Sequence, residues 1–304
     1  MKFDIIGKRY WFFALSALVM IPGLISIAFQ GFNLGIDFTG GTLLDLQFSR
    51  PVTVTEVRAS LQDYNLENST IQLAGSQNIE ASPNVFIRTH VLSDDERRNV
   101  MAGMEKSLGS FDTLRVEKVG AVIGSELTKN AIYALLISWA LMIVYITYRF
   151  EFKFAVSGIL AIVHDLIVVI GIFSLLHKEI DATFVAAILT ICGYSINDTI
   201  VIFDRIRENL KTHSKTEPFA QLVNRSIWQC MTRSIYTVMT VLFATAALYF
   251  FGGETTKNFS LAILIGVASG AYSSIFNASP IWVTWKEYEE RKRIAARTGG
   301  AKSK

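Results

Sequence analysis

Residues 182–203 read ATFVAAILTICGYSINDTIVIF, a run of 22 residues in which Asp198 is the single charged side chain. An α-helix rises about 1.5 Å per residue, so a run of this length can cross the roughly 30 Å hydrocarbon core of a bilayer. The stretch therefore predicts a transmembrane helix that carries a carboxylate near its end.

Five further apolar runs have a similar length, and they cover residues 11–29, 131–148, 154–176, 234–251 and 259–285. Aromatic side chains stand near their ends, as expected for membrane interfaces. The first run could be a signal peptide, because basic residues precede it. The run is too long for one, however, and no small-residue cleavage site follows, so we expect a retained membrane anchor. The sequence thus predicts an α-helical polytopic membrane protein with six transmembrane helices.

The overall composition is only mildly apolar, because it averages nearly uncharged spans with charged segments between them. The chain has 304 residues, of which 51% are hydrophobic and 18% are charged, and its net charge is +3. The charges are concentrated between the apolar runs, which argues against an ordinary soluble enzyme or a disordered chain, and the net charge is too small to suggest nucleic-acid binding. Two cysteines, Cys192 and Cys230, provide no disulfide framework and no zinc-site spacing.

Lysine and arginine predict the orientation of the spans. Eighteen basic residues lie in the N-terminus, the tail and the loops between spans two and three and between spans four and five, whereas Lys178 and Lys257 alone lie in the opposite short loops. The positive-inside rule then places both termini in the cytoplasm.

The segment between the first two spans is predicted to form an extracytoplasmic α+β domain, residues 31–125. Its pattern gives the order βαββαβ of a ferredoxin-like fold, with strands near residues 42–48, 71–73, 85–91 and 114–119. Two helices are expected to begin at capping boxes, Thr53 with Glu56 and Ser93 with Glu96. The remaining divisions are residues 1–30 (N-terminus and first span), 126–286 (a five-helix bundle) and 287–304 (a basic cytoplasmic tail).

This domain contains no motif of catalysis or of cofactor binding. It has no His/Cys cluster, no glycine-rich phosphate loop and no nucleophile motif, so neither an enzyme nor a metal or cofactor is expected. Gly40 and Gly41, at the start of the domain, are expected to allow positive φ in a tight turn.

Ionisable and polar residues inside the spans are the candidate functional residues, because exposing them to lipid is costly. They are His164, Asp165, Asn197, Asp198 and Arg233. Each has a structural alternative: Asp198 could snorkel, Arg233 could be a topology signal, and His164 with Asp165 could be a hydrogen-bonded structural pair. Arg233, Thr237 and Thr240 recur at helical spacing and predict one polar stripe, and Gly266, Gly270 and Ser274 predict close helix packing.

Proton relay is the chemistry that suits these residues. Burial raises the free energy of a charged carboxylate, and a nearby cation lowers it again. Arginine remains protonated and so supplies a fixed counter-charge. Because the sequence contains no nucleotide-binding motif, we expect the proton-motive force to be the energy source.

Three stretches resemble a known family. They are Gly35-Ile36-Asp37-Phe38-Thr39-Gly40-Gly41-Thr42, Val119-Gly120, and Gly193-Tyr194-Ser195-Ile196-Asn197-Asp198-Thr199-Ile200-Val201 followed by Asp204-Arg205-Ile206-Arg207-Glu208-Asn209. The chain is similar to the SecF family, the smaller membrane subunits of the bacterial SecDF accessory complex of the Sec translocase. The resemblance covers essentially the whole chain.

This resemblance implies an RND-superfamily fold in which the chain supplies half of a twelve-span unit. It implies that proton flow, with SecD as partner, drives late steps of preprotein translocation through SecYEG. The family's pathway residues map onto Asp198 and Arg233, with Arg225 a weaker match for the arginine. Two alternatives are a non-conducting scaffold of the translocase and an RND-type exporter of small molecules or lipids.

Overall fold

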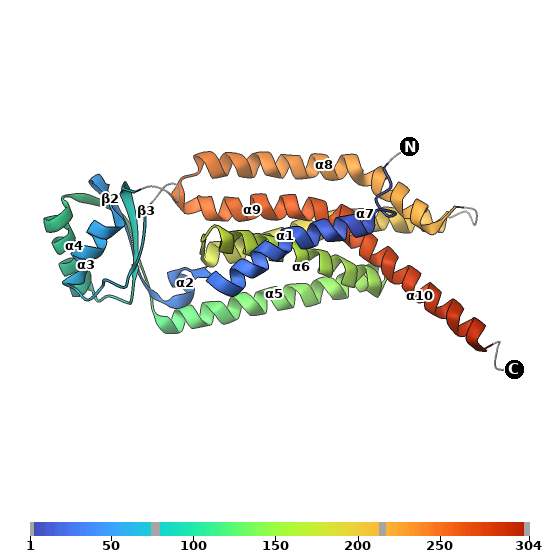
Figure 1. Ribbon diagram of the computed structural model, residues 1–304, viewed down its shortest axis with the longest axis horizontal. Helices are drawn as coiled ribbons and strands as arrows, with labels where there is room; N and C mark the ends of the chain where they lie inside the picture. The colour runs from blue at the N-terminus through green and yellow to red at the C-terminus, as the bar shows by residue number, and fades with distance from the viewer. Residues whose placement is uncertain (1–2, 74–79, 213–216, 301–304) are drawn as a thin grey trace. The chain divides into compact units, whose positions relative to one another are not determined.

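The computed structural model describes residues 3–73, 80–212 and 217–300. The chain divides into two compact units, one formed by Met1–Asn33 with Tyr133–Lys304 and the other by Leu34–Ile132. Within the described residues, six helices, or stretches of joined helices, are long and apolar enough to cross a membrane. All six correspond to the predicted runs, and the chain is therefore a multi-pass helical protein (Figure 1).

The membrane-spanning elements are longer than the apolar runs that predicted them. They are α1 (Arg9–Gln30), α5 (Ala121–Arg149), α6 (Phe152–Leu175), α7 (Ala182–Lys211), α8 (Phe219–Phe251), and α9 (Glu254–Ser273) with α10 (Ser279–Gly300). Two-residue strands, β1 (Asn33–Leu34) and β6 (Glu179–Ile180), lie in the connections. Because α7 continues to Lys211, Asp198 lies well inside a helix rather than near its end.

The fifth membrane-spanning helix begins before its apolar run, as the residues 227–231 that precede Arg233 indicate. The apolar run begins at Ser234, but α8 begins at Phe219. The additional turns are amphipathic, with Leu222, Val223 and Ile227 buried between polar residues. A window that looks for continuous apolarity does not detect such a segment, although its helical periodicity is clear. Arg233 is therefore in the interior of a helix.

The sixth span is one apolar run in the sequence but is not one regular helix. A π-helical turn, η1 (Ser274–Ala278), joins α9 to α10. Pro280 follows this turn, and proline has no N–H to donate to the carbonyl four residues earlier. The i→i−4 hydrogen-bond pattern is therefore interrupted where the π turn occurs, and such turns are frequent at functional sites.

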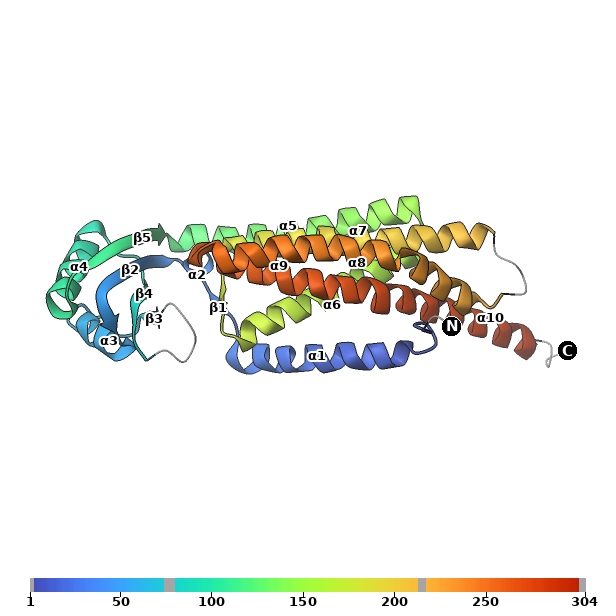
Figure 2. The same ribbon diagram turned by 90° about the horizontal axis from the view of Figure 1, so that it is seen from above.

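Helix α1 packs on α6 through small residues (Figure 2). A Cβ atom added to Gly23 would lie 2.6 Å from the Cα of Gly171, so the two backbones are in direct contact. Ser26 and Ser174 are hydrogen-bonded through their hydroxyls at 2.8 Å, and Ser174 Oγ also donates to the carbonyl of Gly31 at 3.0 Å. Such seams of small and hydroxyl residues hold helices together in lipid.

The predicted small-residue stripe of the last span is confirmed as a packing surface. A Cβ on Gly266 would lie 2.3 Å from Ile191 of α7, and one on Gly270 would lie 3.1 Å from the Cβ of Ser195. The stripe therefore brings α9 close to the segment of α7 that carries Ser195 and Asp198.

The second unit has the predicted element order βαββαβ. It consists of β2 (Gly41–Val52), α3 (Val54–Gln62), β3 (Thr70–Leu73), β4 (Ser82–Thr89), α4 (Asp94–Leu108) and β5 (Phe111–Val119). The sheet order is β3-β4-β2-β5, and every neighbouring pair is antiparallel. Sheet residues such as Leu44 and Ile87 and helix residues such as Leu61 and Met104 form its buried core.

Both predicted capping boxes are present. Thr53 and Ser93 accept hydrogen bonds from the backbone N–H groups of Glu56 and Glu96, whose carboxylates accept in return from the two capping residues. These hydrogen bonds stabilise the ionised carboxylates and hold the pKa of Glu56 and of Glu96 below the usual value for glutamate.

The two adjacent glycines also have the predicted conformation. A short helix, α2 (Ile36–Thr39), ends at Gly40, and the φ angles of Gly40 and Gly41 are 71° and 139°. A Cβ on Gly41 would lie 2.3 Å from the carbonyl oxygen of Thr89. A larger residue would therefore be strained in its backbone and would clash with β4.

Candidate functional site

Helix α7 presents Asp198 to the interior of the membrane-spanning unit. The side chain is 8% exposed, and its Oδ1 accepts a hydrogen bond from Ser234 Oγ of α8 at 2.6 Å. Oδ2 is buried and forms no hydrogen bond within the described residues, although the hydroxyl of Ser274 also lies against this carboxylate. A carboxylate with an unfilled acceptor in a desolvated site is well suited to gaining and losing a proton.

Arg233 lies on the same cavity as Asp198. The cavity has a volume of about 270 Å³, and the residues that line it are Tyr194, Asn197, Asp198, Val201, Arg233, Thr237, Thr240 and Val241. The predicted polar stripe of α8 thus lines this cavity together with polar residues of α7. No ion pair joins Arg233 to Asp198 within the described residues, and the arginine side chain is exposed.

Arg233 also lines a second cavity of about 420 Å³. Its other charged lining residues are Arg149, Asp204, Arg205 and Glu208. The guanidinium therefore borders a cavity rich in charged side chains and the smaller cavity beside Asp198. An arginine cannot lose its proton, so it supplies a fixed positive charge at the border of both.

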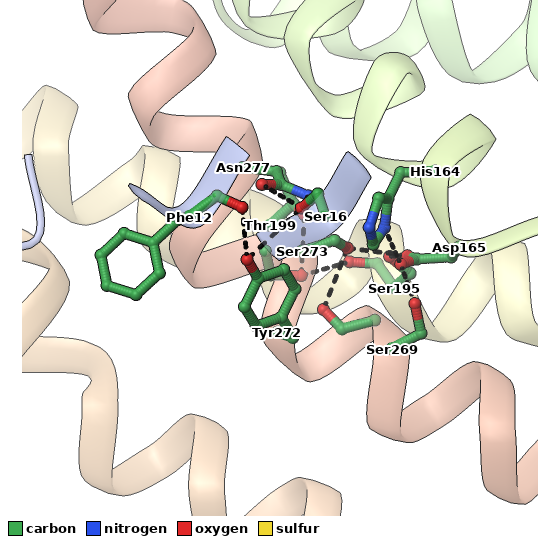
Figure 3. A network of polar contacts seen from close by, with 12 residues as sticks. Phe12, Ser16, His164, Asp165, Ser195, Thr199, Ser269, Tyr272, Ser273 and Asn277 are labelled. Carbon is green, nitrogen blue, oxygen red and sulfur yellow. Dashed lines mark hydrogen bonds and ion pairs between the residues drawn. The ribbon is translucent and has the colours of Figure 1, made fainter. Parts of the chain in front are cut away.

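Asp165 of α6 is the centre of a separate buried cluster (Figure 3). Its Oδ2 accepts hydrogen bonds from Ser195 Oγ at 2.8 Å and from Ser273 Oγ at 2.7 Å. Its Oδ1 accepts one from Ser269 Oγ at 2.7 Å and lies 3.1 Å from His164 Nδ1. Asp165 is fully buried, and four donors from three helices surround its carboxylate.

The polar network continues from His164 towards α1. The rings of His164 and Tyr272 are 6.0 Å apart, and Tyr272 donates its hydroxyl to the carbonyl of Phe12 at 2.8 Å. Ser16 lies within hydrogen-bond distance of Tyr272 and of the buried amide of Asn277. Four helices therefore share this interior network, and Figure 3 shows its side chains converging between them.

The structure places the five predicted residues in two groups. Asn197, Asp198 and Arg233 line one cavity, whereas His164 and Asp165 form the second cluster, which contacts α7 at Ser195. The hydroxyl residues Thr199, Ser234, Ser269 and Ser273 are not evident from the sequence, because serine and threonine are common in transmembrane helices. Ser269 and Ser273 are four residues apart in an apolar run, and this spacing indicates only that their hydroxyls lie on the same side of a helix.

Two family profiles match the chain. One is described as "Protein export membrane protein SecD/SecF, C-terminal" and covers residues 100–288, and the other is the "SecD/SecF GG Motif", residues 25–52. The first alone spans more than half of the chain. The chain belongs to the SecD/SecF family. The GG motif includes the two glycines with positive φ that precede β2.

Curated relatives place the chain with the SecF proteins of this family. A protein translocase subunit SecF from Acidaminococcus fermentans is 51% identical over 95% of this chain and 99% of the relative. The protein translocase subunit SecDF from Bacillus subtilis is 38% identical over 97% of this chain, which spans 40% of that longer protein.

Solved structures show the same fold. The crystal structure of SecDF from Thermus thermophilus, described as a translocon-associated membrane protein, matches with a TM-score of 0.86 and 37% identity, over 94% of this chain and 39% of the SecDF chain. SecDF in its super-membrane-facing form matches with a TM-score of 0.71 and 36% identity, over 97% of this chain and 40% of the other. The SecF-like chain therefore corresponds to about two fifths of a fused SecDF.

Proposed function

We propose that this chain is the SecF subunit of a protein-export complex and uses the proton-motive force to drive late steps of preprotein translocation. Its partner is a SecD chain. This proposal is supported by the SecDF relatives, in which a SecF-like portion matching this chain is fused within a much longer protein. By the same similarity, the complex works beside the SecYEG channel, and the substrate is a translocating preprotein.

One observation carries the proton-coupling part of the proposal: Asp198 and Arg233 line the same cavity of a membrane-spanning unit. A buried carboxylate changes charge when it takes up a proton, and the arginine beside it favours the charged form. Moving one elementary charge across a membrane yields about 2.3 kcal/mol per 100 mV. Asn197, in the same cavity, supplies an amide that hydrogen-bonds water or a partner's side chain.

The exposure of Arg233 supports a partner at this face of α8. Tyr236 and Phe243, further along α8, are 69% and 65% exposed and suit lipid or an apolar protein surface. An arginine facing hydrocarbon costs several kcal/mol, and a partner that offers a carboxylate removes this cost. We therefore place SecD against the face that carries Arg233.

The distribution of basic residues supports the orientation. Both termini lie in the cytoplasm, and the unit Leu34–Ile132 lies on the opposite side of the cytoplasmic membrane. The coupling moves protons and polypeptide without making or breaking a covalent bond of the substrate, so the chain is not an enzyme.

The test is Asp198→Asn in membrane vesicles that contain the partner SecD. We expect the preprotein translocation rate to fall to the rate measured after the proton-motive force is collapsed, while SecD still co-purifies. Glu290→Gln, the same carboxylate-to-amide change at an exposed position of α10, is the control and retains stimulation. Full stimulation in Asp198→Asn would contradict the proposal and favour a non-conducting scaffold.

A further inference from the structure

Asp165 lies in a site that the proposed function does not use. Of the groups that face it, His164 comes from its own helix, the thiol of Cys192 comes from α7, and Tyr272 of α9 lies beyond His164. Within the described residues no lysine or arginine is ion-paired with it. A buried charge without a cation is expensive, so its hydrogen bonds decide whether it can be ionised.

The ionised state of Asp165 is fully hydrogen-bonded. Three serine hydroxyls and His164 Nδ1 provide four donors for two carboxylate oxygens. The second ring nitrogen of His164, Nε2, is buried and has no partner among the described residues. A protonated imidazole would leave an N–H unsatisfied there, so the neutral ring with hydrogen on Nδ1 fits the site and the charge of Asp165 is not cancelled.

The protonated state can be hydrogen-bonded as well, because Ser273 has two possible acceptors. Its Oγ lies 2.7 Å from Asp165 Oδ2 and 3.3 Å from the carbonyl oxygen of Gly270. When a proton adds to Asp165 Oδ2, the new O–H bond donates to Ser273 Oγ, and the Ser273 hydroxyl turns to Gly270. Asp165 Oδ2 and the Ser273 hydroxyl therefore both have hydrogen-bond partners, whether Asp165 is ionised or protonated.

Consecutive residues connect this site to Asp198. Ser273 contacts Asp165, and Ser274, the first residue of η1, lies against Asp198. Ser274 Oγ accepts a hydrogen bond from Thr199 Oγ1 at 3.0 Å and donates to the carbonyl of Ser195 at 3.2 Å. Ser195 in turn donates its own hydroxyl to Asp165. Contacts through the start of the π turn therefore join the surroundings of the two carboxylates.

We propose that Asp165 is a second proton-exchanging carboxylate of this chain, and that Ser273 is the positioning residue that keeps it hydrogen-bonded in both protonation states. The role in coupling rests on the proposed function, whereas the proton exchange itself does not. It is a property of the interior of this chain and requires no group from a partner.

The test is pH-dependent infrared spectroscopy of the carboxylic C=O stretch, on the full chain with its SecD partner in lipid vesicles. The Asp198→Asn background removes the signal of the other carboxylate. We expect the difference between the spectra with and without Asp165→Asn, both in this background, to contain a pH-dependent carboxylic band that the added substitution removes. If no band depends on Asp165 across the pH range in which the complex is folded, the proposal is wrong.

Ser273 variants in the same background keep the proposal testable if Asp165→Asn does not assemble. Ser273→Ala is expected to move the midpoint of the band by about one pH unit, the shift that corresponds to one hydrogen bond. Ser273→Thr restores the hydroxyl and the midpoint. Ser279→Ala, which removes a buried hydroxyl with no partner in the described chain, is the control. Equal midpoints for Ser273→Ala and Ser279→Ala would overturn the role of Ser273.

Export measurements separate this proposal from the proposed function. If Asp165 carries protons that drive export, Asp165→Asn lowers the proton-motive stimulation of translocation. Normal stimulation in Asp198→Asn contradicts the proposed function without affecting the infrared result. Conversely, loss of stimulation in Asp198→Asn with no Asp165-dependent band supports the proposed function and overturns the inference about Asp165.

Discussion

The hydroxyl of Ser234 lies 2.6 Å from Oδ1 of Asp198, so α8 supplies a direct hydrogen bond to the carboxylate of α7. Ser234 directly follows Arg233 along the helix. The same helical turn therefore provides a fixed positive charge and a hydroxyl that responds to the protonation of Asp198. This pairing of adjacent residues leads to the first prediction.

Ser234→Ala is expected to reduce proton-motive stimulation of translocation about tenfold or more, because a hydrogen bond to a charged group contributes about 1.5–3 kcal/mol. Ser234→Thr keeps the hydroxyl and most of the activity. Thr245→Val is the control on the same helix, since Thr245 donates only to the carbonyl of Val241 in its own helix. Equal losses in Ser234→Ala and Thr245→Val would contradict this role for the hydroxyl.

Gly171→Val is expected to separate α1 from α6. The backbones of Gly23 and Gly171 are in contact, so added methyl groups have no space, and overpacking of this kind costs about 1–3 kcal/mol. The measurement is the thermal unfolding temperature of the purified protein in detergent, which should fall. Gly193→Ala, where no atom lies within 4 Å of the added Cβ, should leave it unchanged. A similar fall in the unfolding temperature of both variants would contradict a particular role for the contact between Gly23 and Gly171.

Acidification is expected to weaken the first turns of α3 and α4. The pKa values of Glu56 and Glu96 are lowered in the folded protein by hydrogen bonds from Thr53 and Ser93. Their contribution to stability is therefore fully present above the unfolded pKa of about 4.3 and is lost as the pH falls through the lower folded values. Amide hydrogen exchange, corrected for the intrinsic pH dependence, should report this loss.

Glu56→Gln should remove the acid-dependent part of the exchange in α3 and leave that of α4 unchanged. Glu105→Gln, in the last turns of α4 and outside either capping box, is the control. Persistence of the same pH dependence in α3 of Glu56→Gln would show that another group is responsible.

Pro280→Ala is expected to make the junction of α9 and α10 more regular. Alanine restores an N–H that can donate to the carbonyl of Phe276, which favours an α-helical turn over η1. Residues 274–278 would then rotate relative to α9, and Ser274 would lose its hydrogen bonds to Thr199 and Ser195. Isotope-edited infrared spectra of labelled carbonyls in this segment would detect the change, and an unchanged spectrum would contradict the role of Pro280.

Local features of the sequence predicted much of the fold. The capping boxes, the glycines with positive φ and the order of elements in the second unit depend on neighbouring residues, and they are confirmed. Residues 227–231 indicate that α8 begins before its apolar run, but the alternation of polar and apolar residues in its first turns hides how far it extends, to Phe219. The π turn precedes Pro280, and the sequence alone does not show which hydrogen-bond pattern the backbone adopts in the turn before a proline.

The grouping of the polar residues could not be predicted in the same way. Asp165 and Asp198 both interrupt apolar runs, and nothing in their local sequence tells which residues lie opposite them. Their separation depends on which face of α7 contacts α9, and the close approach at Gly266 and Gly270 determines that contact. The serines around Asp165 come from α7 and α9 and acquire their role only through this packing.

The seam between α1 and α6 has a mechanical consequence. Ser174 of α6 donates a hydrogen bond to the carbonyl of Gly31, so the end of α1 is fixed against α6. The chain then leaves α1 through Gly31, which has a φ of 68°. The return path is α5, a continuous helix that crosses the boundary between the two units at residues 132 and 133. The segment after Gly31 is also held, because β1 pairs with β6 and the side chain of Asn33 donates to the carbonyl of His177 at 3.0 Å. Both covalent connections between the two units therefore run through ordered backbone, one through a paired strand and the other through a helix.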